Sequence, residues 1–223
     1  MALSDVDVAS AELVLFDFDG TLADSMPSII STARQVMHEH GWSDEKLGDM
    51  RRLVGPPFPQ AFELVYGVSP EEARSITEDY RAIYSNLGRS GWPVFDGAAE
   101  LLQELKDGGR ILATASSKRE FLLERGLRTN GIWELFDFPF GKRSDDGETK
   151  AQIIGRVLEA SGVSAGEAVM VGDRRFDAEA AAACGVPCVG VLYGKTCEEK
   201  ELVEAGCCRI AHSVEELRAL LVG

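Results

Sequence analysis

The stretch Leu13-Val14-Leu15-Phe16-Asp17-Phe18-Asp19-Gly20-Thr21 decides the fold class of this chain. Its first four residues are apolar without polar alternation, which is typical of a strand buried on both faces of a parallel sheet. Asp17 and Asp19 follow at once, and unpaired carboxylates are not stable in an apolar interior. We therefore expect both at the carboxyl end of the strand, in the crevice where open α/β sheets bind ligands.

Asp17 and Asp19 belong to a predicted tight turn, so their negative charges need an offsetting cation. Mg²⁺ is the simplest candidate because it is a hard ion that prefers oxygen ligands. The alternative is an ordinary strand followed by an Asp-Gly turn, in which the carboxylates only support the local backbone. The rest of the chain is needed to choose between these two interpretations.

The composition limits the class of protein. The chain has 223 residues, of which 45% are hydrophobic, enough for one large domain or for a core with a smaller domain. The net charge of -14 argues against nucleic acid as a partner. No apolar run approaches the roughly 20 residues that cross a membrane. A small anionic substrate is compatible with this charge if cations, amides or a metal gather locally.

The N-terminal segment and the cysteines favour a cytoplasmic location. Residues 1–12 contain two Asp and one Glu but no Lys or Arg, which is unlike a signal peptide. The five cysteines are odd in number and form no C-x-x-C pair, so we expect free thiols rather than disulfides or a zinc site. Monomer and homodimer are both compatible with these features.

Strand and helix patterns alternate from Trp92 onward. Apolar runs at 111–115, 168–171 and 188–192 predict buried strands, and a shorter strand is predicted at 209–211. This alternation predicts a doubly wound parallel sheet, a Rossmann-like α/β core. Residues 133–138 are too aromatic to assign, and 141–148 is predicted to be a polar loop.

The first two predicted strands are separated by almost a hundred residues, far more than a single crossover helix needs. From Pro27 to about Arg89 the pattern is helical, with helices expected at 27–40, 44–54, 58–66 and 70–87. We predict an α/β core made of residues 1–24 and 92–223, with residues 25–91 inserted as a helical cap domain. A cap beside the crevice suggests a lid that closes over substrate and excludes water.

Polar side chains of complementary type follow the other predicted strands. They are Ser116, Ser117 and Lys118 after the second strand, Asp173 and Asp177 after a later one, and Lys150 at the start of the helix between. If these strand ends are adjacent, they share one crevice with Asp17 and Asp19. Carboxylates chelate a hard cation, whereas a hydroxyl and an ammonium bind a phosphoryl group without competing for the metal.

In this order the motifs resemble those of the haloacid dehalogenase superfamily, specifically its phosphatases with a helical cap after the first strand. The D-x-D-G-T motif spans Asp17 to Thr21, the strand-end serine is Ser116, the isolated lysine is Lys150, and G-D-x-x-x-D spans Gly172 to Asp177. The resemblance covers Leu13 to Leu221. The loop ahead of Lys150, with Asp146-Gly147, is similar to that of phosphoglycolate-phosphatase-like members.

The resemblance implies a Mg²⁺-dependent phosphatase that hydrolyses a small phosphorylated metabolite through an aspartyl-phosphate. Asp17 is then the nucleophile, and Asp19 is the general acid and afterwards the general base. The implied metal ligands are Asp17, the Asp19 backbone carbonyl, Asp173 and Asp177. Lys150 and Ser116 are implied to bind the phosphoryl oxygens, and Gly20, Thr21, Ser117 and Lys118 to bind substrate. Asp19 also separates this chain from the halide-cleaving members, which lack the second acid.

Several of the site residues have alternatives when only the sequence is considered. Thr114 projects to the same side of its strand as Ser116, and Lys142 competes with Lys150 for the role of phosphate ligand. Asp173 and Asp177 could merely cap the alanine-rich helix that follows. Arg51 and Arg52 lie in the predicted cap and are left without a role.

Other functions are also compatible with the pattern. A phosphosugar mutase of the same superfamily shares the aspartyl-phosphate but returns the phosphoryl group to its substrate. A phosphonatase needs a cap lysine as a Schiff base, and the predicted cap has only Lys46, in a polar segment. A non-catalytic phosphate-binding or signalling module would be expected to have lost Asp19 or the lysine, and this chain has both.

Overall fold

The centre of the molecule is a parallel sheet of six strands in the order β3-β2-β1-β4-β5-β6. This computed structural model describes residues 7–145 and 147–223. The strands are β1 (Leu13–Phe16), β2 (Ile111–Arg119), β3 (Phe138–Lys142), β4 (Ala168–Gly172), β5 (Cys188–Val191) and β6 (Arg209–Ala211). The predicted doubly wound α/β fold is confirmed, and β1 lies at its centre between β2 and β4.

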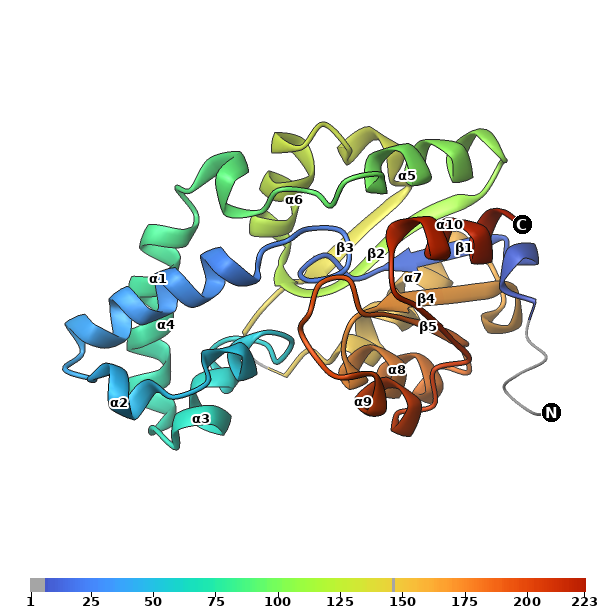
Figure 1. Ribbon diagram of the computed structural model, residues 1–223. Coiled ribbons are helices and arrows are strands. Elements are labelled where there is room, and N and C mark those ends of the chain that lie inside the picture. Colours follow the sequence, from blue (N-terminus) through green and yellow to red (C-terminus); the bar gives the residue numbers. More distant parts are fainter. Residues whose placement is uncertain (1–6, 146) are drawn as a thin grey trace.

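The four apolar residues of β1 point alternately to two hydrophobic clusters. Val14 and Phe16 pack with α5 (Ala98–Asp107), α6 (Glu120–Thr129) and α10 (Val214–Val222). Leu13 and Leu15 pack with α7 (Lys150–Ser161) and α8 (Arg175–Ala183) on the other face (Figure 1). Because both faces are covered, every position of the strand is apolar.

The helices that follow β1 form one continuous body, which we call the helical segment (residues 26–91). It contains α1 (Met26–Glu39), α2 (Asp44–Leu47), α3 (Gln60–Tyr66), α4 (Pro70–Tyr84) and the short 3-10 helices η3 (Met50–Leu53) and η4 (Gly88–Gly91). Helices α1 to α4 lie together at one end of the molecule (Figure 1). That this segment moves as a separate cap domain stays a prediction.

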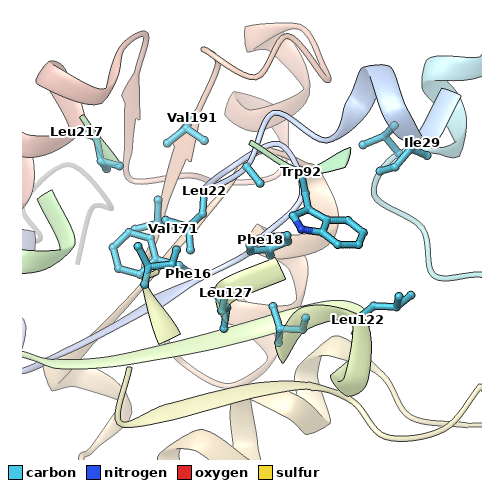
Figure 2. Packing of buried hydrophobic residues seen from close by; sticks show 14 of the residues in the cluster. Phe16, Phe18, Leu22, Ile29, Trp92, Leu122, Leu127, Val171, Val191 and Leu217 are labelled. Carbon is cyan, nitrogen blue, oxygen red and sulfur yellow. The ribbon is translucent and has the colours of Figure 1, made fainter. Parts of the chain in front are cut away.

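The helical segment shares its core with the sheet. Trp92 is fully buried where the chain returns from the segment, and Figure 2 shows it beside Phe18. The Phe18 ring packs so closely on α6 that a Cβ at Gly126 would lie 2.6 Å from it. A side chain at position 126 would therefore displace the ring of Phe18, the residue between Asp17 and Asp19.

Some predicted boundaries are wrong. The expected helix 44–54 is broken after Leu47 by Gly48, whose φ of 55° ends the helical run, and α4 stops at Tyr84 rather than at residue 87. Strand β2 continues through Ser116 to Arg119 and β3 reaches Lys142, because polar residues are tolerated where strands leave the apolar layer.

Residues 133–138 form the 3-10 helix η5 (Trp133–Leu135) and then the start of β3. The short elements without a predicted counterpart include η4, α9 (Glu199–Glu204), η2 (Val8–Ser10) and η6 (Ala165–Glu167). Among the helices of the part of the chain that the structure describes, none is both long and apolar enough to cross a membrane.

Candidate active site

Three buried carboxylates meet at the carboxyl ends of β1 and β4. Asp17, Asp173 and Asp177 each offer an oxygen, and these oxygens all lie within 4.8 Å of one another. The parallel pairing of Phe16 with Val171 explains this, since the residues after both strands then leave the sheet at the same edge. We call Asp17, Asp173 and Asp177 the acidic cluster; their exposed fractions are 5%, 1% and 1%.

Lys150 provides a positive charge for this cluster. Its Nζ lies 2.8 Å from Asp17 Oδ2 and also contacts Asp177 Oδ1. The residue stands at the start of α7, where the Thr149 hydroxyl accepts the Gln152 backbone N–H and the Gln152 side chain accepts the Thr149 N–H. Burial lowers the pKa of the Lys150 ammonium, but Asp17 and Asp177 outweigh this and raise it. Lys150 therefore stays charged.

Lys142 is also buried, but its ammonium has a different partner. Its Nζ donates to the backbone carbonyl of Asp145 at 3.3 Å. Burial lowers the pKa of the Lys142 ammonium below its usual range. Of the two lysines that the sequence left open, Lys150 is thus the one that contacts the predicted nucleophile.

The acidic cluster has the donor set of a hard cation site. Burial raises the pKa of the Asp173 carboxyl, helped by the charges of Asp177 and Asp17, and burial raises that of Asp177 to about 6 against the opposing effect of Lys150. Asp173 Oδ1 accepts a hydrogen bond from the Thr21 hydroxyl at 3.2 Å. Its other oxygen, Oδ2, is buried without a hydrogen-bond partner among the residues that the structure describes. Oxygen donors with an excess of negative charge fit a divalent ion such as Mg²⁺.

Position 20 requires a glycine, because the Asp173 side chain lies against its backbone. The φ of Gly20 is +79°, and a Cβ there would lie 2.2 Å from Asp173 Oδ2. Its backbone N–H donates to the carbonyl of Ala23, and the Thr21 hydroxyl is engaged by Asp173. Gly20 and Thr21 thus shape the acidic cluster in this structure, whereas the resemblance assigned them to substrate.

Asp19 lies apart from the acidic cluster and pairs with Lys118. Lys118 Nζ lies 2.8 and 3.0 Å from the two Asp19 carboxylate oxygens, and 3.2 Å from the hydroxyl of Tyr84. Both residues line a cavity of about 70 Å³ together with Asp17. The predicted role of the Asp19 backbone carbonyl as a metal ligand stays a prediction.

The serines at the end of β2 also line this cavity. Ser116 is 1% exposed, and its Oγ accepts the backbone N–H of Lys118 at 3.3 Å. Ser117 contributes to the cavity wall as well. The hydroxyl of Thr114 instead donates to the carbonyl of Phe140 at 3.0 Å, which directs it to β3. The geometry therefore favours Ser116 over Thr114 as a group that meets a ligand.

The structure also shows the surroundings of Asp177, Arg51 and Arg52, whose roles the sequence left open. Asp177 Oδ2 accepts the backbone N–H of Arg174 at 3.0 Å, so Asp177 supports the first turn of α8 while its Oδ1 contacts Lys150. Arg51 is exposed and pairs with Asp49 at 2.7 Å. Arg52 is likewise exposed, and neither arginine lines the cavity.

The helical segment closes the other side of the cavity. Phe58, Tyr80 and Tyr84 line it, together with the loop Val54-Gly55-Pro56-Pro57 between η3 and α3. None of these residues was predicted to belong to the site. Tyr80 and Tyr84 lie four residues apart on one predicted helix, which places them on one face, but the pattern does not say which face meets the sheet.

Asp145 connects the helical segment to the sheet. Arg81 from α4 donates to both of its carboxylate oxygens, at 2.6 and 2.7 Å, and Arg119 from β2 lies 3.0 Å away. Gln60 from α3 donates to its backbone carbonyl at 3.2 Å. Burial opposes ionisation, but the two arginines lower the pKa of the Asp145 carboxyl. Asp145 thus links the helical segment to the sheet through Arg81 and Arg119, which both line the cavity.

Asp145→Asn is expected to lower the free energy of unfolding by about 1–3 kcal/mol at neutral pH, because two charged hydrogen-bond donors lose their charged partner. The lowered pKa makes this contribution complete above the unfolded pKa of about 3.9, and it is lost as the pH falls through the folded value. The difference between the two proteins in urea unfolding should therefore be largest at about pH 7 and shrink as the pH falls below about 4. A difference that does not change with pH would contradict this account.

The comparisons with known proteins agree with the geometry. The model of the haloacid dehalogenase-like hydrolase family matches residues 14–191. The chain belongs to this family. The match runs from β1 to the end of β5, so it includes every residue of the acidic cluster, as well as Asp19 and Lys118.

Two relatives are similar to this chain along most of its length. A 5'-nucleotidase of Pseudomonas aeruginosa is 31% identical over 188 residues, which are 84% of this chain and 85% of that protein. The tyrosine-protein kinase PtkA of Mycobacterium tuberculosis is 37% identical over 188 residues, or 83% of this chain, but this match spans only 63% of that longer relative.

A solved structure confirms the fold of the chain. The crystal structure of a predicted phosphatase from Clostridium acetobutylicum has a TM-score of 0.87 and 33% identity, and covers 94% of this chain and 97% of that one. The predicted resemblance to the haloacid dehalogenase superfamily is confirmed, as is the predicted enzyme class, a phosphoric monoester hydrolase.

Proposed function

We propose that the chain is a Mg²⁺-dependent phosphatase that hydrolyses a small phosphomonoester through an aspartyl-phosphate on Asp17. The observation that carries this proposal is the surroundings of Asp17, which is buried, paired with Lys150 at 2.8 Å and exposed to a cavity that Asp19 also lines. A carboxylate in such a place is a nucleophile held at a fixed point beside a possible proton donor.

The proposed reaction has two steps. Asp17 attacks the phosphorus while the bond to the leaving oxygen breaks, and protonated Asp19 gives its proton to that oxygen. Asp19, now a carboxylate, takes a proton from water as this water attacks the phosphorus, and the bond to Asp17 breaks to release inorganic phosphate. Lys150 and the Ser116 hydroxyl stabilise the charge on the phosphoryl oxygens during both steps.

Asp17, Asp173 and Asp177 are the side chains proposed to hold Mg²⁺, with the Asp19 backbone carbonyl as a further ligand. A bound Mg²⁺ supplies positive charge that lowers the repulsion between the Asp17 carboxylate and the phosphate. The unpaired Oδ2 of Asp173 and the raised pKa values of Asp173 and Asp177 support this assignment.

The substrate is proposed to be a small phosphorylated metabolite. The cavity of about 70 Å³ supports a small group beside Asp17. Phosphoglycolate, a nucleotide and a sugar phosphate are the candidates, and the name of the Pseudomonas relative supports the nucleotide. Phe58, Tyr80 and Tyr84 would contact the part of the substrate beyond the phosphate. The cytoplasmic location and the choice between monomer and homodimer stay predictions.

The test is release of inorganic phosphate from p-nitrophenyl phosphate and from a panel of phosphometabolites, with Mg²⁺ or with EDTA. We expect turnover in Mg²⁺ and none in EDTA. Isomerised substrate without released phosphate would instead indicate the mutase, and no reaction with any ester would contradict the proposal.

Asp173→Asn is expected to change metal binding and stability in opposite directions. In EDTA the variant should be more stable than the wild type by about 1 kcal/mol, because one of three crowded buried charges is removed. In the wild type, Mg²⁺ at 100 times its Kd should add about 2.7 kcal/mol, and the variant should lose most of that gain. Thermal unfolding with and without Mg²⁺ measures both. A variant that is less stable in EDTA and still fully stabilised by Mg²⁺ would exclude Asp173 as a ligand.

A further inference from the structure

Lys118 is fully engaged by partners within the protein. An ammonium has three protons to donate, and Lys118 Nζ has three acceptors: the two Asp19 oxygens at 2.8 and 3.0 Å and the Tyr84 hydroxyl at 3.2 Å. A substrate oxygen could bind Lys118 only by displacing one of them. This differs from the substrate-binding role that the resemblance assigned to Lys118.

The surroundings of Lys118 fix its position. The side chain is 5% exposed, and Nζ lies 4.7 Å from the ring centre of Tyr84, 5.5 Å from that of Phe18 and 5.7 Å from that of Trp92. We call Phe18, Tyr84 and Trp92 the aromatic cage. Aromatic faces attract a cation and exclude water. Few water molecules therefore compete with the Asp19 carboxylate for the Lys118 ammonium.

The aromatic cage joins the helical segment to the sheet. Tyr84 is the last residue of α4, whereas Phe18 belongs to the loop after β1 and Lys118 to β2. The Tyr84 ring stacks on Tyr80 at 4.9 Å and meets Trp92 edge to face at 5.2 Å. The position of α4 thus decides whether the hydroxyl of Tyr84 reaches Lys118.

We propose that Lys118 is a positioning residue that orients the Asp19 carboxyl for proton transfer, and that Tyr84 makes this orientation depend on the placement of α4 over the site. The inference rests on the proposed function, since it assigns the proton transfers to Asp19. Without Lys118, the Asp19 side chain can turn away from the phosphoryl site, and its proton transfer then loses the geometry that makes it effective.

The test is the kinetics of Lys118→Met with Mg²⁺ and a phosphomonoester that the wild type hydrolyses. Methionine keeps the length of the side chain but loses its charge and its donors. We expect kcat to fall about 10²-fold while KM changes less than about twofold, because an interaction with Asp19 rather than with the substrate is lost. Lys118→Arg, which keeps a charged donor, should recover kcat to within about tenfold of the wild type.

A double-mutant cycle with Asp19→Asn separates positioning from a general structural role. If Lys118 acts through Asp19, then Lys118→Met should reduce the residual single-turnover rate of Asp19→Asn less than about twofold. Lys106→Met is the matched control, since it removes a lysine that pairs with Asp137 at 2.6 Å outside the site and should leave kcat unchanged. A mainly raised KM, or an equal loss in both backgrounds, would overturn the proposal.

Tyr84→Phe provides the second test if Lys118→Met does not fold. It removes one hydroxyl from the aromatic cage and keeps the ring. We expect kcat to fall about 3- to 10-fold with an unchanged KM, and no further loss in the Asp19→Asn background. An unchanged kcat would overturn the role of Tyr84. A wild type without turnover on any ester would contradict the proposed function itself. In that case a crystal structure of Lys118→Met with an unmoved Asp19 side chain would still overturn the positioning role.

Discussion

Asp17→Asn is expected to abolish Mg²⁺-dependent hydrolysis of p-nitrophenyl phosphate, with kcat reduced on the order of 10⁴-fold or more. Asparagine has the shape of aspartate, but its amide cannot form the phosphoryl bond that the proposed reaction needs. The substitution also replaces the oxygen charge that faces Lys150 at 2.8 Å. Steady-state kinetics measure the loss directly.

The phosphorylated intermediate provides a second measurement on the same variant. Wild-type protein quenched in acid during turnover should carry one phosphoryl group on the peptide that contains Asp17, and the variant should carry none. Asp24→Asn is the matched control, because it makes the same change seven residues along the chain at a half-buried side chain outside the cavity. Phosphate on another residue, or turnover retained by Asp17→Asn, would contradict the assignment of the nucleophile.

Lys150→Met is expected to give the largest loss of stability. The ammonium lies among buried carboxylates, so its removal leaves the charges of Asp17 and Asp177 uncompensated. Removing one partner of a buried ion pair typically costs about 3–5 kcal/mol, and we expect a loss of this size in urea unfolding at about pH 7.5 with EDTA. Activity should fall by about 10²- to 10³-fold as well, since a donor to the phosphoryl oxygens is lost.

The pH dependence identifies the cause of this loss. Without Lys150 the folded-state pKa values of Asp173 and Asp177 rise further above their unfolded values, so the folded state gains stability as the pH falls and protons neutralise these carboxylates. The deficit of Lys150→Met should thus shrink toward about pH 5, and saturating Mg²⁺ should also reduce it.

Lys142→Met is the control for the burial of a lysine. Lys142 is 3% exposed but donates to a backbone carbonyl rather than to a carboxylate. Its replacement should cost about 1 kcal/mol, with little dependence on pH. Equal losses for the two lysine variants would show that Lys150 acts as packing and not as the counter-charge of the acidic cluster.

Much of the fold and of the acidic cluster follows from local sequence. Four apolar residues before Asp17 require a strand covered on both faces, and strand–helix alternation after Trp92 requires a parallel sheet. Parallel strands end at a common edge, so Asp17, Asp173 and Asp177 could be predicted to meet. The choice of Lys150 rested on its likeness to a family motif, because a lysine has no periodic signal of its own.

Tertiary structure alone decided what the remaining polar groups contact. Lys118 donates hydrogen bonds to Asp19 and Tyr84, and the Thr21 hydroxyl donates one to Asp173. Asp145 pairs with Arg81 and Arg119. These pairs join residues between 26 and 152 positions apart in the chain. Local patterns report which face of an element is apolar, whereas a contact across such a distance depends on how whole elements pack, and no repeat in the sequence records that.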